Sequence, residues 1–208
     1  VPAWNVTPPK DLEAIELLTQ AYFESNYDLR AVLRVLFNSD FFKNSRFTRV
    51  KSPAEMVVST LRLSGSFSGP RLGYQAVAAE CGFQGQELLN PPSVESWHTG
   101  EEWIDGGALV RRVNFAAKYL SDTKQPGIKS IVERLKTQGT LSPEQCVEQC
   151  LDLLGPLEVS DSTHQELVDQ ASQGGDIRWD SDTAAQDAER RIGVTLALVA
   201  ASREYQFA

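Results

Sequence analysis

The chain has 208 residues, a hydrophobic content of 41% and a formal net charge of −8, with a pI of about 4.9. A chain of this length can bury a sizeable core as one compact domain. The negative charge argues against binding nucleic acid or an anionic membrane surface, because both attract Lys and Arg. No apolar run approaches the roughly 18 residues that a membrane helix needs, so no membrane span is predicted.

The chain begins at Val1, and Met56 is its only methionine. We therefore expect a processed product or a piece excised from a longer protein. The first residues lack the charged, apolar and small-residue regions of a signal peptide, although processing would have removed such a segment.

Two amphipathic helices are predicted near the N-terminus. Residues from about 10 to 25 have an apolar face at helical spacing, formed by Leu12, Ile15, Leu18 and Tyr22. The next helix follows Asp28, which can cap it, and its apolar positions fit the i, i+3, i+4, i+7, i+8 pattern: Leu29, Val32, Leu33, Leu36 and Phe37. The stretch FNSDFFKNSRFTRVK is then predicted as irregular chain that carries exposed or docking aromatic side chains.

The central part of the chain predicts three further helices. Ser52-Pro53-Ala54-Glu55 is a strong start signal, because a serine cap, a proline at the first position and a returning glutamate suit a helix N-terminus. A helix from about Arg71 to Cys81 should end at Gly82, since glycine adopts the left-handed conformation that ends many helices. After a long loop, residues 106–120 return to helical spacing.

The last third is predicted as a series of helices joined by polar turns. A short helix is expected over residues 125–135, and a Ser-Pro start like that at residue 52 predicts another after Ser142. A further helix follows Asp161, and the final one runs from about Thr183 to Arg203.

The whole pattern predicts an all-α fold, because no window shows sustained strand alternation. We expect an irregular multi-helix bundle with long aromatic- and Pro/Gly-containing loops and little or no β structure. Residues 1–120 would form a helical core with the Pro-Pro/Trp loop. Residues 121–208 would form a helical appendix and closing helix, packed on the same core as one domain.

The loop at residues 90–107, NPPSVESWHTGEEWIDGG, contains candidates for a ligand site. Trp97 and Trp103 are large apolar groups with one hydrogen-bond donor each. Packing against neighbouring helices is the favoured interpretation, because buried aromatic side chains more often pack than bind ligands. The alternative is a platform for a sugar or another ring, which requires at least one tryptophan to be accessible.

His98 lies among acidic residues of this loop, and with Glu101 and Asp105 it could bind a divalent metal or act in acid–base catalysis. The spacing lacks the paired histidines of known metal motifs, so a solvated loop histidine is favoured. Cys146 and Cys150 could likewise hold half a metal site, but small buried apolar filler is favoured. No cofactor is predicted, because the chain has no phosphate-binding loop and no Gly-x-Ser-x-Gly elbow.

Two neighbouring arginines, Arg111 and Arg112, lie in a largely apolar helix, so one of them must point inward or sideways. A buried arginine is nearly always paired, and the candidate partners are Glu55, Glu80 and Asp105. We predict a structural ion pair here rather than a substrate clamp.

Several segments resemble the motifs of one family, the bacterial domain-of-unknown-function family 1800. Pro91-Pro92 through Trp103-Ile104 resembles its PP-x-V-x-G-W-x-x-G-x-x-W-I segment, which is followed by a helix with Leu-x-x-Arg and Asn-Phe, here Leu109, Arg111 or Arg112, and Asn114-Phe115. LRAVLRVLFNSDFF is similar to its Leu-Phe-x-Ser-x-x-Phe helix, and VKSPAEMVVSTLRLSG to its Lys-Ser-Pro-x-Glu helix. VAASREYQFA resembles its closing Ser-Pro-Glu-Tyr/Phe-Gln motif. The match corresponds to the C-terminal half of the family domain.

The resemblance implies a helical bacterial protein that is usually exported, so we expect a secreted or periplasmic location. It implies no activity. The sequence departs from the family pattern at Ser96, where glycine is usual, at His98, and at Arg203, where the closing motif has proline. Because the N-terminal half of the family domain is missing, a site shared between the halves would be incomplete.

Two functions remain as hypotheses. The favoured one is a non-catalytic, extracytoplasmic binding or assembly module, whose partner is a protein, the missing half of the family domain, or a glycan. It predicts an exposed apolar patch larger than a monomer usually shows. The alternative is a metal-dependent or hydrolase-like enzyme with a site around residues 93–105. That site would gather His98 with carboxylates or with Arg111 and Arg112.

Overall fold

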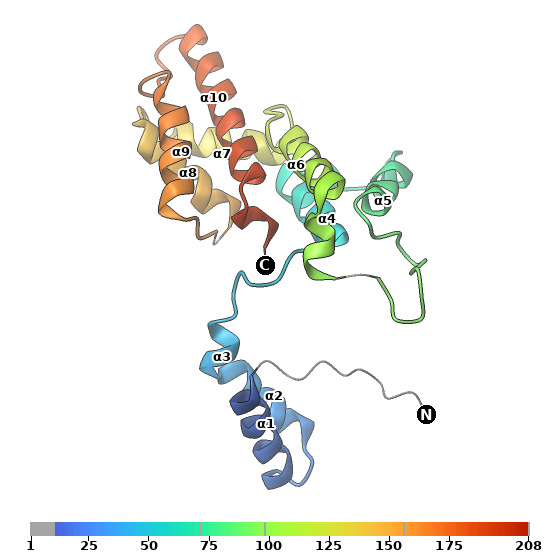
Figure 1. Ribbon diagram of the computed structural model, residues 1–208. Helices are drawn as coiled ribbons and strands as arrows, with labels where there is room; N and C mark the ends of the chain where they lie inside the picture. The colour runs from blue at the N-terminus through green and yellow to red at the C-terminus, as the bar shows by residue number, and fades with distance from the viewer. Residues whose placement is uncertain (1–10, 71, 98, 156, 208) are drawn as a thin grey trace. The chain divides into compact units, whose positions relative to one another are not determined.

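The computed structural model describes residues 11–70, 72–97, 99–155 and 157–207 (Figure 1). Ten α-helices and two 3-10 helices form among these residues, and no β-strand does. The antiparallel pairs that occur are isolated bridges. The predicted all-α fold is therefore confirmed. The chain divides into two compact units, Val1–Thr48 and Arg49–Ala208, which are described separately.

The N-terminal unit consists of α1 (Leu12–Glu24), α2 (Leu29–Asn38) and α3 (Asp40–Lys43). α1 and α2 pack against each other. The side chain of Asp28 accepts a hydrogen bond from the amide of Arg30 at 2.9 Å. The predicted cap of the second helix is therefore confirmed.

The prediction of irregular chain after Phe37 is wrong for residues 40–43, which form α3. The amide of Phe42 donates a hydrogen bond to the hydroxyl of Ser39 at 3.3 Å. Ser39 therefore ends α2 and also caps α3, because serine suits the N-cap position. The rings of Phe37 and Phe42 meet edge to face, with their centroids 5.2 Å apart.

The second unit begins with α4 (Pro53–Ser64), whose predicted capping box is present. The hydroxyl of Ser52 accepts from the amide of Glu55 at 3.2 Å, and the Glu55 carboxylate accepts from the amide of Ser52 at 2.7 Å. Each group satisfies a helix-end donor that would otherwise lack a partner.

The next helix, α5 (Tyr74–Phe83), starts later than predicted and continues through Gly82. Gly82 is therefore not the glycine that ends it. The chain turns at Gly85, whose φ of 99° lies in the left-handed region that other residues rarely adopt. The prediction that Gly82 ends this helix is therefore wrong, because the left-handed turn comes three residues later.

The remaining elements follow in chain order: η1 (Gly100–Ile104), α6 (Gly106–Leu120), α7 (Pro126–Lys136), α8 (Pro143–Leu154), α9 (Asp161–Ser172), α10 (Asp182–Ala201) and η2 (Glu204–Gln206). The predicted start of α8 is confirmed, since Ser142 and Gln145 form a second capping box. None of the described helices is long and apolar enough to span a membrane.

The core of the second unit is organised around α10, which contacts α6, α7, α8 and α9 (Figure 1). Met56 and Leu120 share this core with Ile192 and Leu196. Side chains from both sides of residue 120 therefore contribute to one core. A smaller cluster of Val57, Leu61 and Cys81 packs α4 against α5.

The contact between α4 and α7 depends on a glycine. A Cβ added at Gly127 would lie 1.9 Å from the carbonyl oxygen of Leu63, much closer than two atoms can approach. The backbones of the two helices therefore meet directly at this point. This contact holds α7 against α4, and α7 contributes Ile128 and Leu135 to the main core.

Candidate functional site

The two tryptophans of the predicted loop differ in exposure. Trp103 is buried, and its ring lies 3.6 Å from the position that a Cβ would occupy at Gly85. Trp97 is half-buried, and its indole nitrogen donates a hydrogen bond to the carbonyl oxygen of Glu87 at 2.9 Å. Trp103 thus packs inside the unit. A ring platform on this loop would have to use Trp97.

Of the candidate metal ligands at this loop, His98 lies outside the described residues. Glu101 and Asp105 are both exposed. Within the described part of the chain, no three His, Cys, Asp or Glu side chains come together in a way that could hold a metal ion. A metal site at this loop therefore stays a prediction.

Cys146 and Cys150 lie side by side in the main core and are both buried free thiols. A hydrogen bond from Cys150 lowers the pKa of Cys146, whereas the same contact, together with burial, raises the pKa of Cys150. Neither thiol is accessible from solvent. Their placement fits the interpretation as apolar filler.

Arg111 and Arg112 point in different directions from α6. Arg111 reaches across to α5, where its Nε and Nη2 donate to the two carboxylate oxygens of Glu80 at 3.0 and 2.9 Å. Its guanidinium also lies 4.2 Å from the ring centroid of Phe83. The Glu80 carboxylate raises the pKa of Arg111. Glu80 was one of the three candidate partners, and it forms the predicted ion pair.

The Arg111–Glu80 pair lies in an open groove of about 440 Å³ between α5 and α6. Val110 and Phe115 give the groove apolar walls, while Asn114 and Lys118 add polar groups. Its one carboxylate, that of Glu80, is already occupied by Arg111. The groove therefore has the character of a shallow polar surface and not of a site with two free acids.

Arg112 is fully buried. Its Nε donates to the side-chain oxygen of Gln206 at 3.0 Å, and its Nη2 donates to the carbonyl oxygen of Lys51 at 2.9 Å. Among the described residues, its Nη1 has no hydrogen-bond partner. Burial lowers the pKa of Arg112 to about 10, an effect that the charge of Glu55 partly offsets.

The prediction that a carboxylate would pair directly with a buried arginine is wrong for Arg112. Its hydrogen bonds go to an amide and a carbonyl, because Glu55 is engaged elsewhere. Glu55 accepts two hydrogen bonds of 2.7 Å from Arg49, and this contact lowers its pKa to about 2. Glu55 influences Arg112 through its charge alone.

Lys51 lies beside the same arginine. Its ammonium donates to the carbonyl oxygen of Tyr205 at 2.8 Å and lies 4.4 Å from the centroid of the Tyr205 ring. Burial, and then repulsion from Arg112, lowers the pKa of Lys51 to about 8. Two cations are thus held close together without a bound carboxylate between them, an arrangement that costs free energy.

The junction at Arg112 joins three of the segments that carry the family resemblance. Lys51 begins the Lys-Ser-Pro-x-Glu segment, Arg112 falls at the arginine of Leu-x-x-Arg counted from Leu109, and Gln206 ends the closing motif. A backbone hydrogen bond of 2.9 Å, from the amide of Lys51 to the carbonyl of Gln206, reinforces the contact. The fold therefore brings these segments together around one buried side chain.

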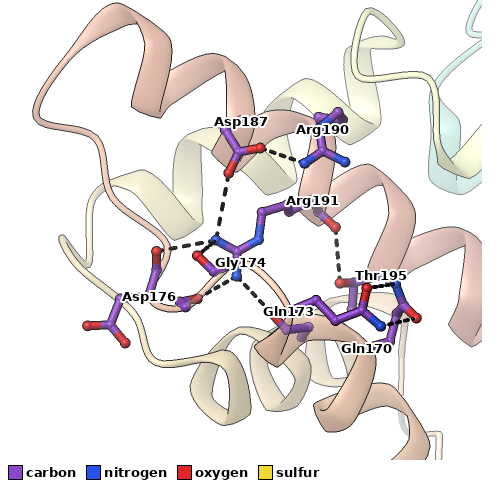
Figure 2. Close-up of polar contacts among 10 residues, drawn as sticks. Gln170, Gln173, Gly174, Asp176, Asp187, Arg190, Arg191 and Thr195 are labelled. Atoms are coloured by element: carbon purple, nitrogen blue, oxygen red, sulfur yellow. Dashed lines mark hydrogen bonds and ion pairs between the residues drawn. The ribbon is translucent and has the colours of Figure 1, made fainter.

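A second arginine, Arg191 on α10, also joins segments that are distant in the chain (Figure 2). Its Nη2 donates to the carbonyl oxygens of Ala171 at 2.7 Å and of Gly175, and its Nη1 donates to that of Gly174 at 3.1 Å. Ala171 lies in the last turn of α9, where carbonyls lack helical partners and a positive charge is favourable. Arg191 thus pins the end of α9 to α10.

A pocket of about 240 Å³ lies beside Arg191 and is lined in part by Gln170, Gln173 and Arg190. The two glutamines hydrogen-bond to each other at 3.1 Å, and Arg190 pairs with Asp187 (Figure 2). Its polar lining is therefore satisfied within the protein. No sequence pattern indicates these contacts, because Arg191 lies in an ordinary helical segment, far along the chain from the loop that it binds.

The fold and these contacts define an all-helical protein in which a buried arginine, Arg112, and a half-buried one, Arg191, tie distant segments together. The chain belongs to the family described as "Protein of unknown function (DUF1800)", which it matches over residues 4–207. The resemblance seen in the motifs is thereby confirmed, and the match spans nearly the whole chain. That the chain corresponds to the C-terminal half of the family domain stays a prediction. No curated protein and no solved structure matches the chain.

Proposed function

We propose that this chain is a non-catalytic binding or assembly module that docks a protein through its N-terminal unit. One observation carries the proposal: ten large apolar side chains of this unit are exposed by 37–65%. They are Leu12, Ile15, Leu17, Tyr22, Phe23, Tyr27, Leu29, Leu33, Phe37 and Phe42. In the described part of the unit, Ala14 is the one buried hydrophobic residue.

The physical reason is that two short helices cannot cover their own apolar surface. Isolated helices of this length are marginal in water, and most helical stability in proteins comes from packing an apolar face. Soluble monomers rarely expose contiguous apolar patches larger than a few hundred Å², and larger patches mark interaction sites. A protein partner that covers α1 and α2 would supply the missing contacts.

Two grooves of the second unit support a binding role better than a catalytic one. The groove between α5 and α6 offers one carboxylate, Glu80, which is paired, and the pocket beside Arg191 offers no free charge. A hydrolase-like or metal-dependent site around residues 93–105 is the alternative function, and it would depend on His98. A glycan stacked on Trp97 is the alternative partner.

The proposed module works outside the cytoplasm, in the secreted or periplasmic space that the family resemblance implies. The net charge of −8 suits such a location, because it disfavours adsorption to anionic membrane surfaces. Fractionation of the source cells with an antibody against the chain tests the location. Recovery in the cytoplasmic fraction alone would contradict it.

Photo-crosslinking tests the docking surface. A photoreactive residue placed at Leu33 is expected to form a specific adduct with a protein of the source cells. The matched control is Leu72 of the second unit, which is 97% exposed but lies outside the proposed surface. The proposal would be wrong if no adduct forms at Leu33, or if Leu33 and Leu72 give the same adducts.

Metal content tests the alternative function. Mass spectrometry of the purified chain, with His98→Ala beside it, would show a stoichiometric metal lost in the variant if the enzyme hypothesis holds. The proposed module predicts the same content in both samples.

A further inference from the structure

The two main helices of the N-terminal unit carry opposite charges. α1 contains Glu13, Glu16 and Glu24 and no basic residue, whereas α2 contains Arg30 and Arg34 and no acidic residue. These side chains form no ion pair with any described residue. The charges are therefore available to a partner.

The exposed apolar stripes of α1 and α2 lie on one side of the helical pair. On α1, the exposed Leu12, Ile15, Tyr22 and Phe23 lie on one side by helical period and form one stripe. On α2, Leu29, Leu33 and Phe37 repeat every four residues and form another. The helices are joined by the short turn at residues 25–28, so they run antiparallel (Figure 1). Viewed from the N-terminus of each helix, the exposed stripe is reached by turning in the same direction from the buried side. Because the two helices run antiparallel, the two stripes then lie on the same face of the pair.

Charged side chains border these stripes. By helical period, Glu16 lies at the outer edge of the α1 stripe, and Arg30 lies at the outer edge of the α2 stripe, with Arg34 next to it. The face therefore has an apolar centre, one acidic edge along α1 and one basic edge along α2. A surface of this kind is complementary to itself after a half-turn rotation.

The size of the face also suits a partner of the same kind. The seven large apolar side chains of the two stripes, each exposing about 80 Å², would cover about 560 Å², close to the roughly 600 Å² that each side contributes at the lower end of stable interfaces. The centre would be apolar and the rim charged, as in most such interfaces. The apolar surface is thus large enough to hold two chains together.

We propose that the apolar face of α1 and α2 binds the same face of a second copy of this chain. In the twofold dimer, α1 of each copy lies over α2 of the other, which gives a four-helix arrangement. This pairing brings glutamates opposite arginines, whereas stacking α1 on α1 would bring like charges together. The proposal rests on the proposed function and names its partner.

Sedimentation velocity of the full chain across the micromolar range tests the dimer. The wild-type chain is expected to sediment as a dimer, and Leu33→Asp is expected to weaken the dimer about tenfold or more. Leu72→Asp, an equally apolar-to-acidic change on the second unit, should leave the dimer intact. A wild-type monomer, or a dimer unaffected by Leu33→Asp, would overturn the proposal.

Charge exchange tests the arrangement. Glu13→Arg with Glu16→Arg makes both helices basic, and Arg30→Glu with Arg34→Glu makes both acidic. Each variant alone is expected to lose the dimer, because like charges then face each other. An equimolar mixture should recover a dimer that contains one chain of each kind, which also shows that both variants are folded. A mixture that stays monomeric would overturn the pairing of α1 with α2.

The crosslinking experiment separates this inference from the proposed function. An adduct at Leu33 that contains two copies of the chain supports the dimer. An adduct with a different protein supports the docking surface and overturns the second copy as its occupant. Without any adduct, both proposals fail.

Discussion

Helices α10 and α2 both show a regular apolar stripe, yet they differ in what covers it. On α10, Ile192, Leu196 and Val199 are fully buried. On α2, Leu29, Leu33 and Phe37 remain 65%, 47% and 54% exposed. α10 packs against four helices of its own unit, whereas α2 packs mainly against α1 and α3.

The difference shows what an amphipathic pattern can and cannot predict. The pattern identifies a helix and the face that will avoid water, because side-chain direction follows helical period. It does not identify the surface that covers that face. In the second unit the covering surface comes from distant segments of the same chain. In the N-terminal unit we propose that it comes from a second copy.

The largest effect is expected where the second unit holds its buried arginine. Arg112→Ala should destabilise the chain by about 3–5 kcal/mol, because it removes a fully buried side chain and leaves two buried acceptors without donors. Urea unfolding measures the loss. Arg111→Ala is the control, and because its ion pair is partly exposed, its loss should cost only about 1 kcal/mol. Equal losses would contradict the distinction between the two arginines.

A smaller loss is expected where α4 and α7 touch. Gly127→Ala should cost about 2–3 kcal/mol, because the new Cβ cannot fit against the carbonyl of Leu63 and the helices must separate. Gly107→Ala in α6 provides the control, since nothing lies within 4 Å of its added Cβ. That control should be neutral or slightly stabilising. Thermal unfolding of both variants decides the matter, and a neutral Gly127→Ala would refute the close contact.

The lysine beside Arg112 should make the second unit respond to pH. The pKa of Lys51 is about 8 in the folded chain and returns to its ordinary value of 10.5 on unfolding. Between these values the unfolded state binds more protons, so the free energy of unfolding should rise with pH, by about 1 kcal/mol after allowance for partial exposure. Urea unfolding at several pH values measures this slope. The free energy of unfolding of the Lys51→Met variant should rise less between the same pH values. Identical slopes for the variant and the wild-type chain would argue against a buried charge.

The smallest effect is expected in the N-terminal unit. In dilute solution, where the proposed dimer dissociates, Leu33→Gln should change the free energy of unfolding by less than about 0.5 kcal/mol, as exposed substitutions usually do. Leu196→Gln in the core should be far more damaging, because it buries an amide without a partner. A large loss for Leu33→Gln in dilute solution would mean that its face is covered within a single chain.

The helix starts illustrate what could be predicted from sequence. Asp28, Ser52 and Ser142 cap the helices that follow them as predicted, because a cap depends on atoms within three residues along the chain. The helix ends were less certain. Gly82 has the residue type that ends a helix, but α5 continues through it, since the left-handed turn occurs at Gly85.

The candidate site was only partly predictable, because its contacts join residues that are far apart in the chain. The ion pair of Arg111 with Glu80 was among the expected pairs, and one of two adjacent arginines was expected to point inward. The helix pattern does not show which arginine points inward or which groups accept its hydrogen bonds. Arg191 was missed altogether, because its partners are backbone carbonyls and carry no sequence signal.

The sequence by itself determined the helical class, the positions of most helices and the family, because these depend on periodicity, caps and motifs within short stretches of chain. Only the tertiary structure decided that Arg112 meets Lys51, 61 residues away, and Gln206, 94 residues away. It also decided which apolar faces are buried within the chain. Such contacts depend on how whole helices pack, and packing is set by the combined shape of many side chains instead of by any local pattern.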